Sequence, residues 1–218
     1  ALREFAWRRA VRLYPMFWLI SVAMLAGFLL VPALGNEREL TVAGTVADLA
    51  LLPHADAILS ISWTLRHEVV FYAIFGLALW GGKRMLLLIP AWIVISMIGA
   101  ILHLDADSLG LASLIASPLN LGFGLGILCA MAIRRDRPKR PALWAAAGGL
   151  ALLGLAIAEW TLGRGLAHAV SVLGVGGEIA YLIAASLLIY GLVSKEPDWR
   201  IPHASLIKVL GGSSYILY

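Results

Sequence analysis

The stretch Ser60–Trp80, "SISWTLRHEVVFYAIFGLALW", decides how the chain is interpreted. Its second half is apolar enough for the interior of a bilayer, and roughly 20 such residues cross the hydrocarbon core as a helix. Yet Arg66, His67 and Glu68 lie together a few residues inside its start. Charge in hydrocarbon is costly, so ionisable side chains persist there only where they are paired, hydrated or functional.

The composition of the whole chain predicts a membrane protein. Of the 218 residues, 61% are hydrophobic and only 14% are charged, whereas soluble domains are nearer half apolar and a quarter charged. The apolar runs do not alternate with polar residues, which argues against a β-barrel. The sequence therefore predicts an all-α, polytopic transmembrane helix bundle with six full spans and one partial span. The predicted full spans are Leu13–Leu34, Ile61–Trp80, Met85–Leu102, Leu114–Ile133, Ala142–Trp160 and Gly177–Val193, and the partial span begins near Leu206.

Basic residues lie in alternate loops of this prediction. The stretches "REFAWRRAVR", "GGKR", "RRDRPKR" and "SKEPDWRIPHASLIK" hold 14 of the 17 Lys and Arg residues, and only Arg38, Arg66 and Arg164 lie elsewhere. The positive-inside rule assigns these four loops to the cytoplasm, with residues 1–12 on that side of the lipid bilayer. Because membrane orientation accounts for the basic residues, the net charge of +4 gives no reason to expect a nucleic-acid partner.

The chain shows no internal repeat and no linker, so residues 1–218 are predicted to form a single integral-membrane domain. It starts at Ala1 instead of Met and stops inside an apolar pattern, so we expect a fragment of a longer protein. The single cysteine, Cys129, excludes an intramolecular disulfide and is predicted to be a small buried side chain.

The outward-facing loop between the first two predicted spans contains a short amphipathic pattern. A helix on the membrane surface, or a cap over the bundle, is expected there. Its apolar positions are Leu40, Val42, Val46, Leu49 and Leu52.

One stripe of the predicted helix Ile61–Trp80 carries polar side chains toward the bundle interior. By three- and four-residue spacing, it consists of Thr64, Glu68, Phe71, Tyr72 and Phe75. We expect Glu68 to have a functional role, and the alternative is a structural ion pair or a side chain that extends to the outer surface. Extension to the surface is the expectation for Arg66. His67 is the only one of the five histidines inside a predicted span.

Three further motifs carry polar or small residues. In "WRRAVRLYP", Arg8, Arg9 and Arg12 can form a clamp for phosphate, or can serve only membrane orientation and contact with anionic lipid. In "LGGSSYILY", the hydroxyls of residues 213–215 lie just inside the membrane, although small residues and serines also mediate helix packing. Close helix packing is the preferred interpretation of Gly122, Gly124 and Gly126. The sequence contains no metal-ligand cluster, nucleophile elbow or phosphate-binding loop.

The ordered motifs "RRAVRLYP", "SWTLRHEVVFY", "SPLNLGFGLGILCA" and "LGGSSYILY" resemble the membrane acyltransferase 3 family, and "LLPHADAILSISWTLRHEVVFYAIF" is similar to its exopolysaccharide-modifying branch. The resemblance implies an integral membrane enzyme that moves an acyl group, often acetyl from acetyl-CoA, onto sugars of surface polysaccharides or other envelope acceptors. A bacterial cytoplasmic (inner) membrane is the expected location. It also implies an Arg and a His in a helix upstream of Arg3, with that histidine as general base.

The residue patterns and the resemblance together give the candidate site residues. The family motifs correspond to Arg9, Arg12, Glu68, Tyr72 and residues 213–215, whereas Arg8 and His67 come from the residue pattern alone. The catalytic candidates are Glu68, Tyr72 and His67. The candidates for contact with acyl-CoA, the donor substrate, are Arg8, Arg9, Arg12, Ser213, Ser214 and Tyr215. No tightly bound cofactor and no metal are expected. Two other functions stay open: a transporter or flippase for a lipid-linked sugar, which also needs polar residues around a cavity, and a non-catalytic partner in polysaccharide assembly.

Overall fold

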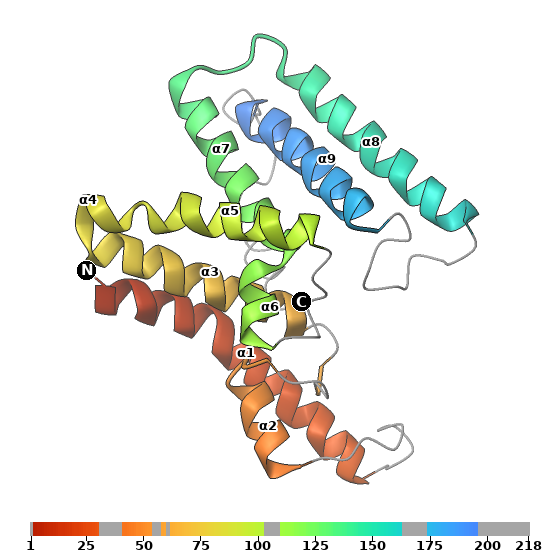
Figure 1. The fold of residues 1–218 in the computed structure, drawn as a ribbon. Helices are drawn as coiled ribbons and strands as arrows, with labels where there is room; N and C mark the ends of the chain where they lie inside the picture. Colours follow the sequence, from red (N-terminus) through yellow and green to blue (C-terminus); the bar gives the residue numbers. More distant parts are fainter. Residues whose placement is uncertain are drawn as a thin grey trace, which may run out of the picture. The chain divides into compact units, whose positions relative to one another are not determined.

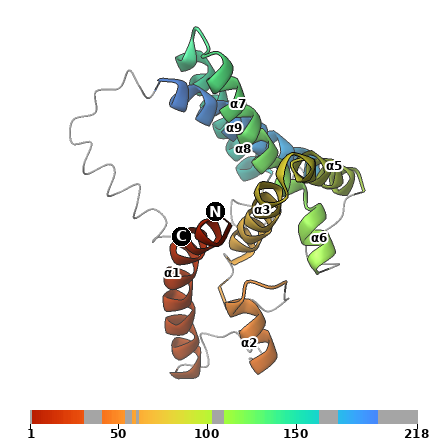
Figure 2. The ribbon, with the colours of Figure 1, turned by 90° about the vertical axis from the view of Figure 1, so that its left-hand side faces the viewer.

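The structure, a computed structural model, describes residues 2–30, 41–53, 58–59, 62–102, 110–162 and 174–195. Every regular element in these ranges is helical, which confirms the predicted all-α class (Figures 1 and 2). The elements are α1 (Leu2–Leu30), α2 (Val42–Leu49), α3 (Ser62–Trp80), α4 (Gly82–Met85), α5 (Leu88–Ile101), α6 (Leu111–Ala116), the 3-10 turn η2 (Pro118–Asn120), α7 (Leu121–Arg135), α8 (Pro141–Thr161) and α9 (Gly174–Lys195).

The described residues fall into two compact units. The first contains those up to residue 89 and residues 110–115, and the second contains residues 90–102, 116–162 and 174–195. The expectation that residues 1–218 form one domain stays a prediction.

In the first unit, α1 and α3 pack against each other in antiparallel directions. The start of α1 meets the end of α3, where Phe5 lies against Gly76. Farther along α1, Leu13 and Phe17 belong to a buried cluster that Val69 of α3 contacts. A Cβ atom on Gly76 would lie 3.3 Å from Leu2 and 3.5 Å from Phe5, so the small residue permits the close approach.

The short helix α2 is joined to α1 by one side chain and one turn. The indole nitrogen of Trp18 donates to the carbonyl oxygen of Leu49 at 2.9 Å. After α2 the chain turns at Leu51, whose φ of 56° is the left-handed conformation that usually favours glycine. The turn is closed by bonds from Leu51 N to Asp48 O and from Leu52 N to Ala47 O, both 2.8 Å. The Leu51 side chain, only 3% exposed, enters the cluster around Leu13 and Phe17, and this burial offsets the backbone strain.

In the second unit, α8 and α9 form a tight helix pair. A Cβ atom on Gly148 of α8 would lie 2.3 Å from the backbone nitrogen of Leu188, and one on Gly191 of α9 would lie 2.3 Å from that of Ala145. Both positions therefore require glycine, and the two backbones touch near these points. Small residues are the usual means of such approach between membrane helices.

Helix α7 packs against α9 and α5 of the same unit, partly as the glycine motif predicts. Cβ atoms on Gly122 and Gly124 would lie 2.9 Å from Leu182 and 2.8 Å from Ile93, whereas nothing lies within 4 Å at Gly126. The packing interpretation is therefore confirmed for the first two glycines and is wrong for Gly126 in the residues that the structure describes. Cys129 is half-buried, and its thiol donates to the Ser186 carbonyl at 3.6 Å.

Among the described residues, four helical segments are long and apolar enough to cross a membrane. They correspond to four of the six predicted spans: Leu2–Leu30, Gly82–Ile101, Pro141–Thr161 and Gly174–Lys195. The first begins at Leu2 instead of Leu13, because the basic segment continues the helix through Pro15 without a break. The predicted partial span from Leu206 lies outside the described residues.

The other two predicted spans are not confirmed. Of the predicted span Ile61–Trp80, residues Ser62–Trp80 form α3, a helix of 19 residues, but its charged first half lowers its hydropathy. Leu114–Ile133 is interrupted at Ser117, which has an extended backbone and whose hydroxyl accepts from Leu119 N at 3.3 Å. Pro118 follows and cannot donate a backbone hydrogen bond. Helix α7 is consequently only 15 residues long.

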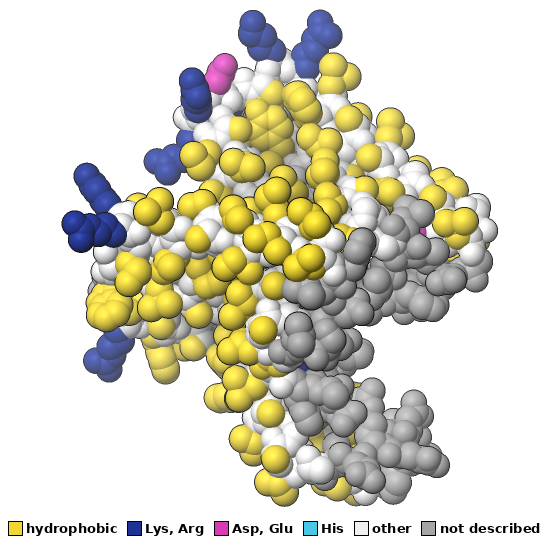
Figure 3. Space-filling model, in the orientation of Figure 1, with side chains coloured by type: hydrophobic (Ala, Val, Ile, Leu, Met, Phe, Trp, Pro, Cys, Tyr) yellow, Lys and Arg dark blue, Asp and Glu magenta, His cyan; other side chains and the backbone are white. Residues whose placement is uncertain are grey.

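The distribution of side chains is that of a protein surrounded by lipid. Apolar side chains cover much of the visible surface in Figure 3, and large ones such as Leu30 and Leu150 are 82% and 69% exposed. The largest fully buried side chains are instead small and polar: Asn120, Asp48, Ser21, Ser62, Ser96, Ser113 and Ser117. Together with the four long apolar segments, this arrangement identifies an integral membrane protein.

Candidate functional site

The candidate site is centred on Tyr72, where α3 faces α1. The Tyr72 hydroxyl donates a hydrogen bond to the carboxylate of Glu68, one turn earlier on α3. On the α1 side, the guanidinium carbon of Arg9 lies 5.1 Å from the centroid of the Tyr72 ring and 5.4 Å from that of Phe5. Such distances are those of cation–π contacts. One aromatic side chain thus connects the predicted carboxylate with one of the predicted arginines.

This arrangement follows from the two helices being antiparallel. Helix α1 begins at Leu2, so Arg9 lies two turns inside it. Helix α3 ends at Trp80, so Tyr72 lies two turns before that end. The sequence predicts Arg9 at one membrane surface and Glu68 in the opposite half, and the structure places both against the same tyrosine.

A groove of about 450 Å³ runs along α1 and α3 beside this contact. Its wall is apolar except for Arg9 and the two phenols of Tyr14 and Tyr72. Glu68 is half-buried and is not part of the groove wall. The carboxylate therefore reaches the groove through the hydrogen bond to Tyr72. The groove is lined by Leu2, Phe5, Ala6, Arg9, Ala10, Leu13, Tyr14, Val69, Tyr72, Ala73, Gly76 and Leu77.

The three arginines of the predicted phosphate clamp do not share one environment. Arg9 is half-buried, and Arg8 and Arg12 are exposed. Arg8 forms an ion pair with Glu4 on the same helix, and both side chains are largely exposed, at 75% and 63%. Only Arg9 of the three lines the groove between α1 and α3. A clamp made by all three side chains therefore stays a prediction.

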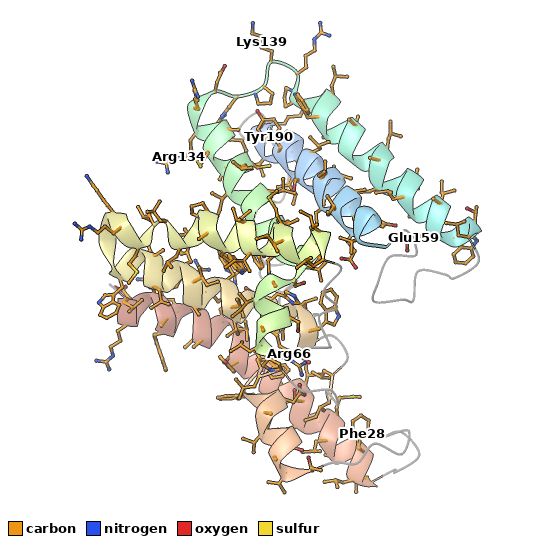
Figure 4. The ribbon with its side chains drawn as sticks, viewed as in Figure 1. Phe28, Arg66, Arg134, Lys139, Glu159 and Tyr190 are labelled. Carbon is orange, nitrogen blue, oxygen red and sulfur yellow. The ribbon has the colours of Figure 1, made fainter. Side chains whose placement is uncertain are left out.

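Arg66 does not extend to a surface. Its side chain is 10% exposed, and Nη2 donates to Asp48 Oδ1 of α2 at 2.9 Å. Asp48 is fully buried and accepts two more hydrogen bonds, from Ile58 N at 2.8 Å and from Ser62 Oγ at 3.3 Å. The expectation of snorkelling is wrong because a buried partner exists. The structural ion pair, the alternative that the sequence also allows, is what forms. Figure 4 labels Arg66.

His67 is held in one tautomer by its own helix. The residue is 5% exposed, and Nδ1 lies 2.8 Å from the carbonyl oxygen of Trp63. A carbonyl only accepts, so Nδ1 carries a hydrogen, and in the neutral ring Nε2 therefore carries the lone pair. Nε2 has no hydrogen-bond partner among the described residues. The Trp63 ring also packs edge-on against the imidazole, with centroids 5.9 Å apart.

The remaining predicted site residues are not covered by the structure. Ser213, Ser214 and Tyr215 lie outside the described residues. A group of three or more His, Cys, Asp or Glu side chains that could hold a metal ion is absent from the described ranges.

The sequence interpretation missed two buried acids. Asp48 lies in the amphipathic segment, for which only the apolar positions were interpreted. It is the acid that pairs with Arg66. Glu159 of α8 is 6% exposed. The available signal was the same for both: a single acid inside a strongly apolar stretch of a membrane protein.

Comparison with known proteins gives a consistent result. The family model described as an acyltransferase domain, acyltransferase 3, matches residues 1–218. The chain is 27% identical over 225 residues to the exopolysaccharide production protein ExoZ of Rhizobium meliloti, an alignment that covers 99% of this chain and 66% of that protein. The chain thus spans slightly less than two thirds of that relative's length. No solved structure shows a significant match. Since the family model matches the whole sequence, the chain belongs to the acyltransferase 3 family.

Proposed function

We propose that the protein containing this chain is a membrane O-acyltransferase of the bacterial inner membrane. It transfers an acyl group from acyl-CoA to a sugar hydroxyl of a cell-surface polysaccharide or another envelope acceptor. The proposed acyl group is acetyl, with acetyl-CoA as the donor. Family membership supports the acyl transfer, and the name of the Rhizobium relative supports a polysaccharide acceptor. Residues 1–12 are on the cytoplasmic side in this proposal, where acyl-CoA is available.

The observation that carries the proposal is the line of contacts from Arg9 through Tyr72 to Glu68. Tyr72 gives its only hydroxyl hydrogen to Glu68, so the lone pairs of the phenol oxygen remain able to accept. A sugar hydroxyl that donates to Tyr72 would have its oxygen oriented for attack on a thioester carbonyl. Its proton can pass to the phenol oxygen while the phenol hydrogen moves to Glu68. The immediate products are an ester, the thiolate of coenzyme A and a protonated Glu68 carboxyl. Return of that proton to the thiolate gives the free thiol and restores the carboxylate.

Arg9 supplies the positive charge on the donor side of the groove. A guanidinium pairs well with phosphate and is weakly hydrated, so it fits a partly buried position. The apolar wall of the groove suits the apolar part of the acyl group. Arg8 and Arg12 are exposed on the same basic segment, and we assign them to the remaining phosphates, for which Arg8 would exchange its contact with Glu4. The roles of Ser213, Ser214 and Tyr215 along the acyl path are part of the same proposal.

The test uses the full-length protein in membrane vesicles with labelled acetyl-CoA and purified envelope glycan. Tyr72→Phe and Glu68→Gln keep the shapes of the two side chains and remove the proton path, so label on the glycan should fall about 100-fold. Arg9→Gln should raise the KM for acetyl-CoA more than it lowers kcat. Arg3→Gln, an exposed arginine on the same helix, is the matched control and should leave transfer unchanged.

The alternatives predict different results. A flippase would move lipid-linked sugar across the vesicle membrane without incorporating label. A non-catalytic partner would show neither activity in the purified protein. Unchanged transfer in well-folded Tyr72→Phe and Glu68→Gln proteins would remove both residues from the mechanism.

A further inference from the structure

A second polar site lies in the other unit, where the loop between α7 and α8 meets the end of α9. A hollow of about 740 Å³ is open there to the surroundings. Three of its lining side chains are the exposed cations Arg137, Lys139 and Arg140, and Asp136 is the single acid. Within the described residues, none of the three cations makes an ion pair. In Figure 3, Lys and Arg side chains gather at this end of the unit.

The wall of the hollow beneath the cations is apolar and aromatic. Trp144 of α8 and Tyr190 of α9 pack edge to face, with centroids 5.9 Å apart and planes at 78°. Leu143 and Ala147 continue the wall along α8. Because the α8 and α9 backbones touch at Gly148 and Gly191, bulky side chains have no room between the helices. The two rings therefore stand beside the contact and form one wall of the hollow.

The combination selects an amphiphile with a negative head. The cations can hold a phosphate group, and Trp and Tyr favour the boundary between headgroups and hydrocarbon. Leu143 and Leu150 of α8 are 59% and 69% exposed, so the surface below the hollow offers space for an acyl chain. A free inorganic phosphate would use the cations and leave the apolar wall empty. We propose that this hollow binds an anionic phospholipid of the surrounding membrane, with the headgroup phosphate at Arg137, Lys139 and Arg140.

Lys139 and Tyr190, both labelled in Figure 4, mark the loop and the end of α9 in this site. The site is separate from the acyl-transfer proposal, since all of its residues belong to the second unit. It also differs from a diffuse basic surface. Arg134 and Arg135 are exposed at the end of α7, close to the loop in sequence, but neither lines the hollow.

That difference supplies the experiment. The full-length protein is purified in detergent with equal amounts of phosphatidylglycerol and phosphatidylcholine, and the bound lipids are counted by native mass spectrometry. Arg137→Gln with Arg140→Gln should lower the ratio of bound phosphatidylglycerol to phosphatidylcholine roughly tenfold. Arg134→Gln with Arg135→Gln removes the same charge from the same end of the unit and should change the ratio less than about twofold. Thermal melting in phosphatidylcholine checks that all variants are folded.

Several results would overturn the proposal. Equal losses in the two double variants would show a general surface attraction without a site. An unchanged ratio in Arg137→Gln with Arg140→Gln would remove the headgroup contact. Displacement of phosphatidylglycerol by millimolar inorganic phosphate or by coenzyme A would assign the cations to a soluble phosphate ligand. Retention against both competitors supports the lipid.

Discussion

The ion pair between Asp48 and Arg66 leads to the most quantitative prediction. Replacing Asp48 by Ala removes three hydrogen bonds at once, to Ile58 N, Ser62 Oγ and Arg66 Nη2. It also leaves the Arg66 side chain, which is only 10% exposed, without this carboxylate. Breaking a buried pair from one side costs about 3–5 kcal/mol, so Asp48→Ala should lower the free energy of unfolding by about that amount.

The pair can be isolated from the rest of the contacts by a double-mutant cycle. Arg66→Met leaves the carboxylate buried without its cation and should also cost about 3–5 kcal/mol. The double variant removes both charges, so its loss should be smaller than the sum of the two single losses by about 2–3 kcal/mol. The measurement is denaturant unfolding of the purified protein in detergent micelles, followed by circular dichroism.

The exposed pair between Glu4 and Arg8 is the internal control. Its side chains are 63% and 75% exposed, and such pairs contribute less than about 1 kcal/mol. The reasoning is refuted if the coupling between Asp48 and Arg66 is no larger than about 0.6 kcal/mol, the average for hydrogen bonds between membrane helices. It is also refuted if the two pairs give equal coupling.

Three other changes test separate features. Gly148→Ala places a methyl group 2.3 Å from the backbone of α9 whereas Gly154→Ala meets nothing within 4 Å on the same helix, so only the first should lower the melting temperature, by several degrees. Trp18→Phe removes the hydrogen bond from the indole to Leu49 O and should cost about 1 kcal/mol, measured by the same unfolding assay; no change would show that α2 is held without it. A Lys139→Cys protein should react with a membrane-impermeant maleimide only after the cytoplasmic face is opened, and labelling of intact cells from outside would reverse the predicted orientation.

Sequence patterns predicted the features that depend on local composition. Apolar runs of bilayer length predicted four of the spans, because an apolar run of that length is sufficient to identify a membrane-crossing helix. The motif order gave the family, because short polar motifs are rare against an apolar background. Where the pattern was interrupted, the prediction was wrong: Ser117 and Pro118 end a helix inside an apolar run, and hydropathy does not record that break.

The site was predictable in its members and not in its contacts. The stripe of α3 correctly placed Glu68 and Tyr72 on one face, because residues four apart are neighbours on a helix. Nothing in the sequence showed that α1 continues back to Leu2 and brings Arg9 onto Tyr72. That contact depends on how the two helices pack. Gly76 permits the close approach, but the residues around it in the sequence do not mark it as a packing position.

The faces that α2 buries and exposes indicate what surrounds the helix. The helix buries Gly44 and Asp48, four residues apart, and exposes Val42 and Val46 at 83% and 59%. In water the opposite orientation would be favoured, because burying a valine side chain is worth about 1.5–3 kcal/mol and burying a carboxylate is costly. Asp48 is compensated by Arg66, but the exposed valines have no compensation in water. They are stable in this position if hydrocarbon covers them, so we expect the segment from Thr41 to Leu52 to lie against the membrane.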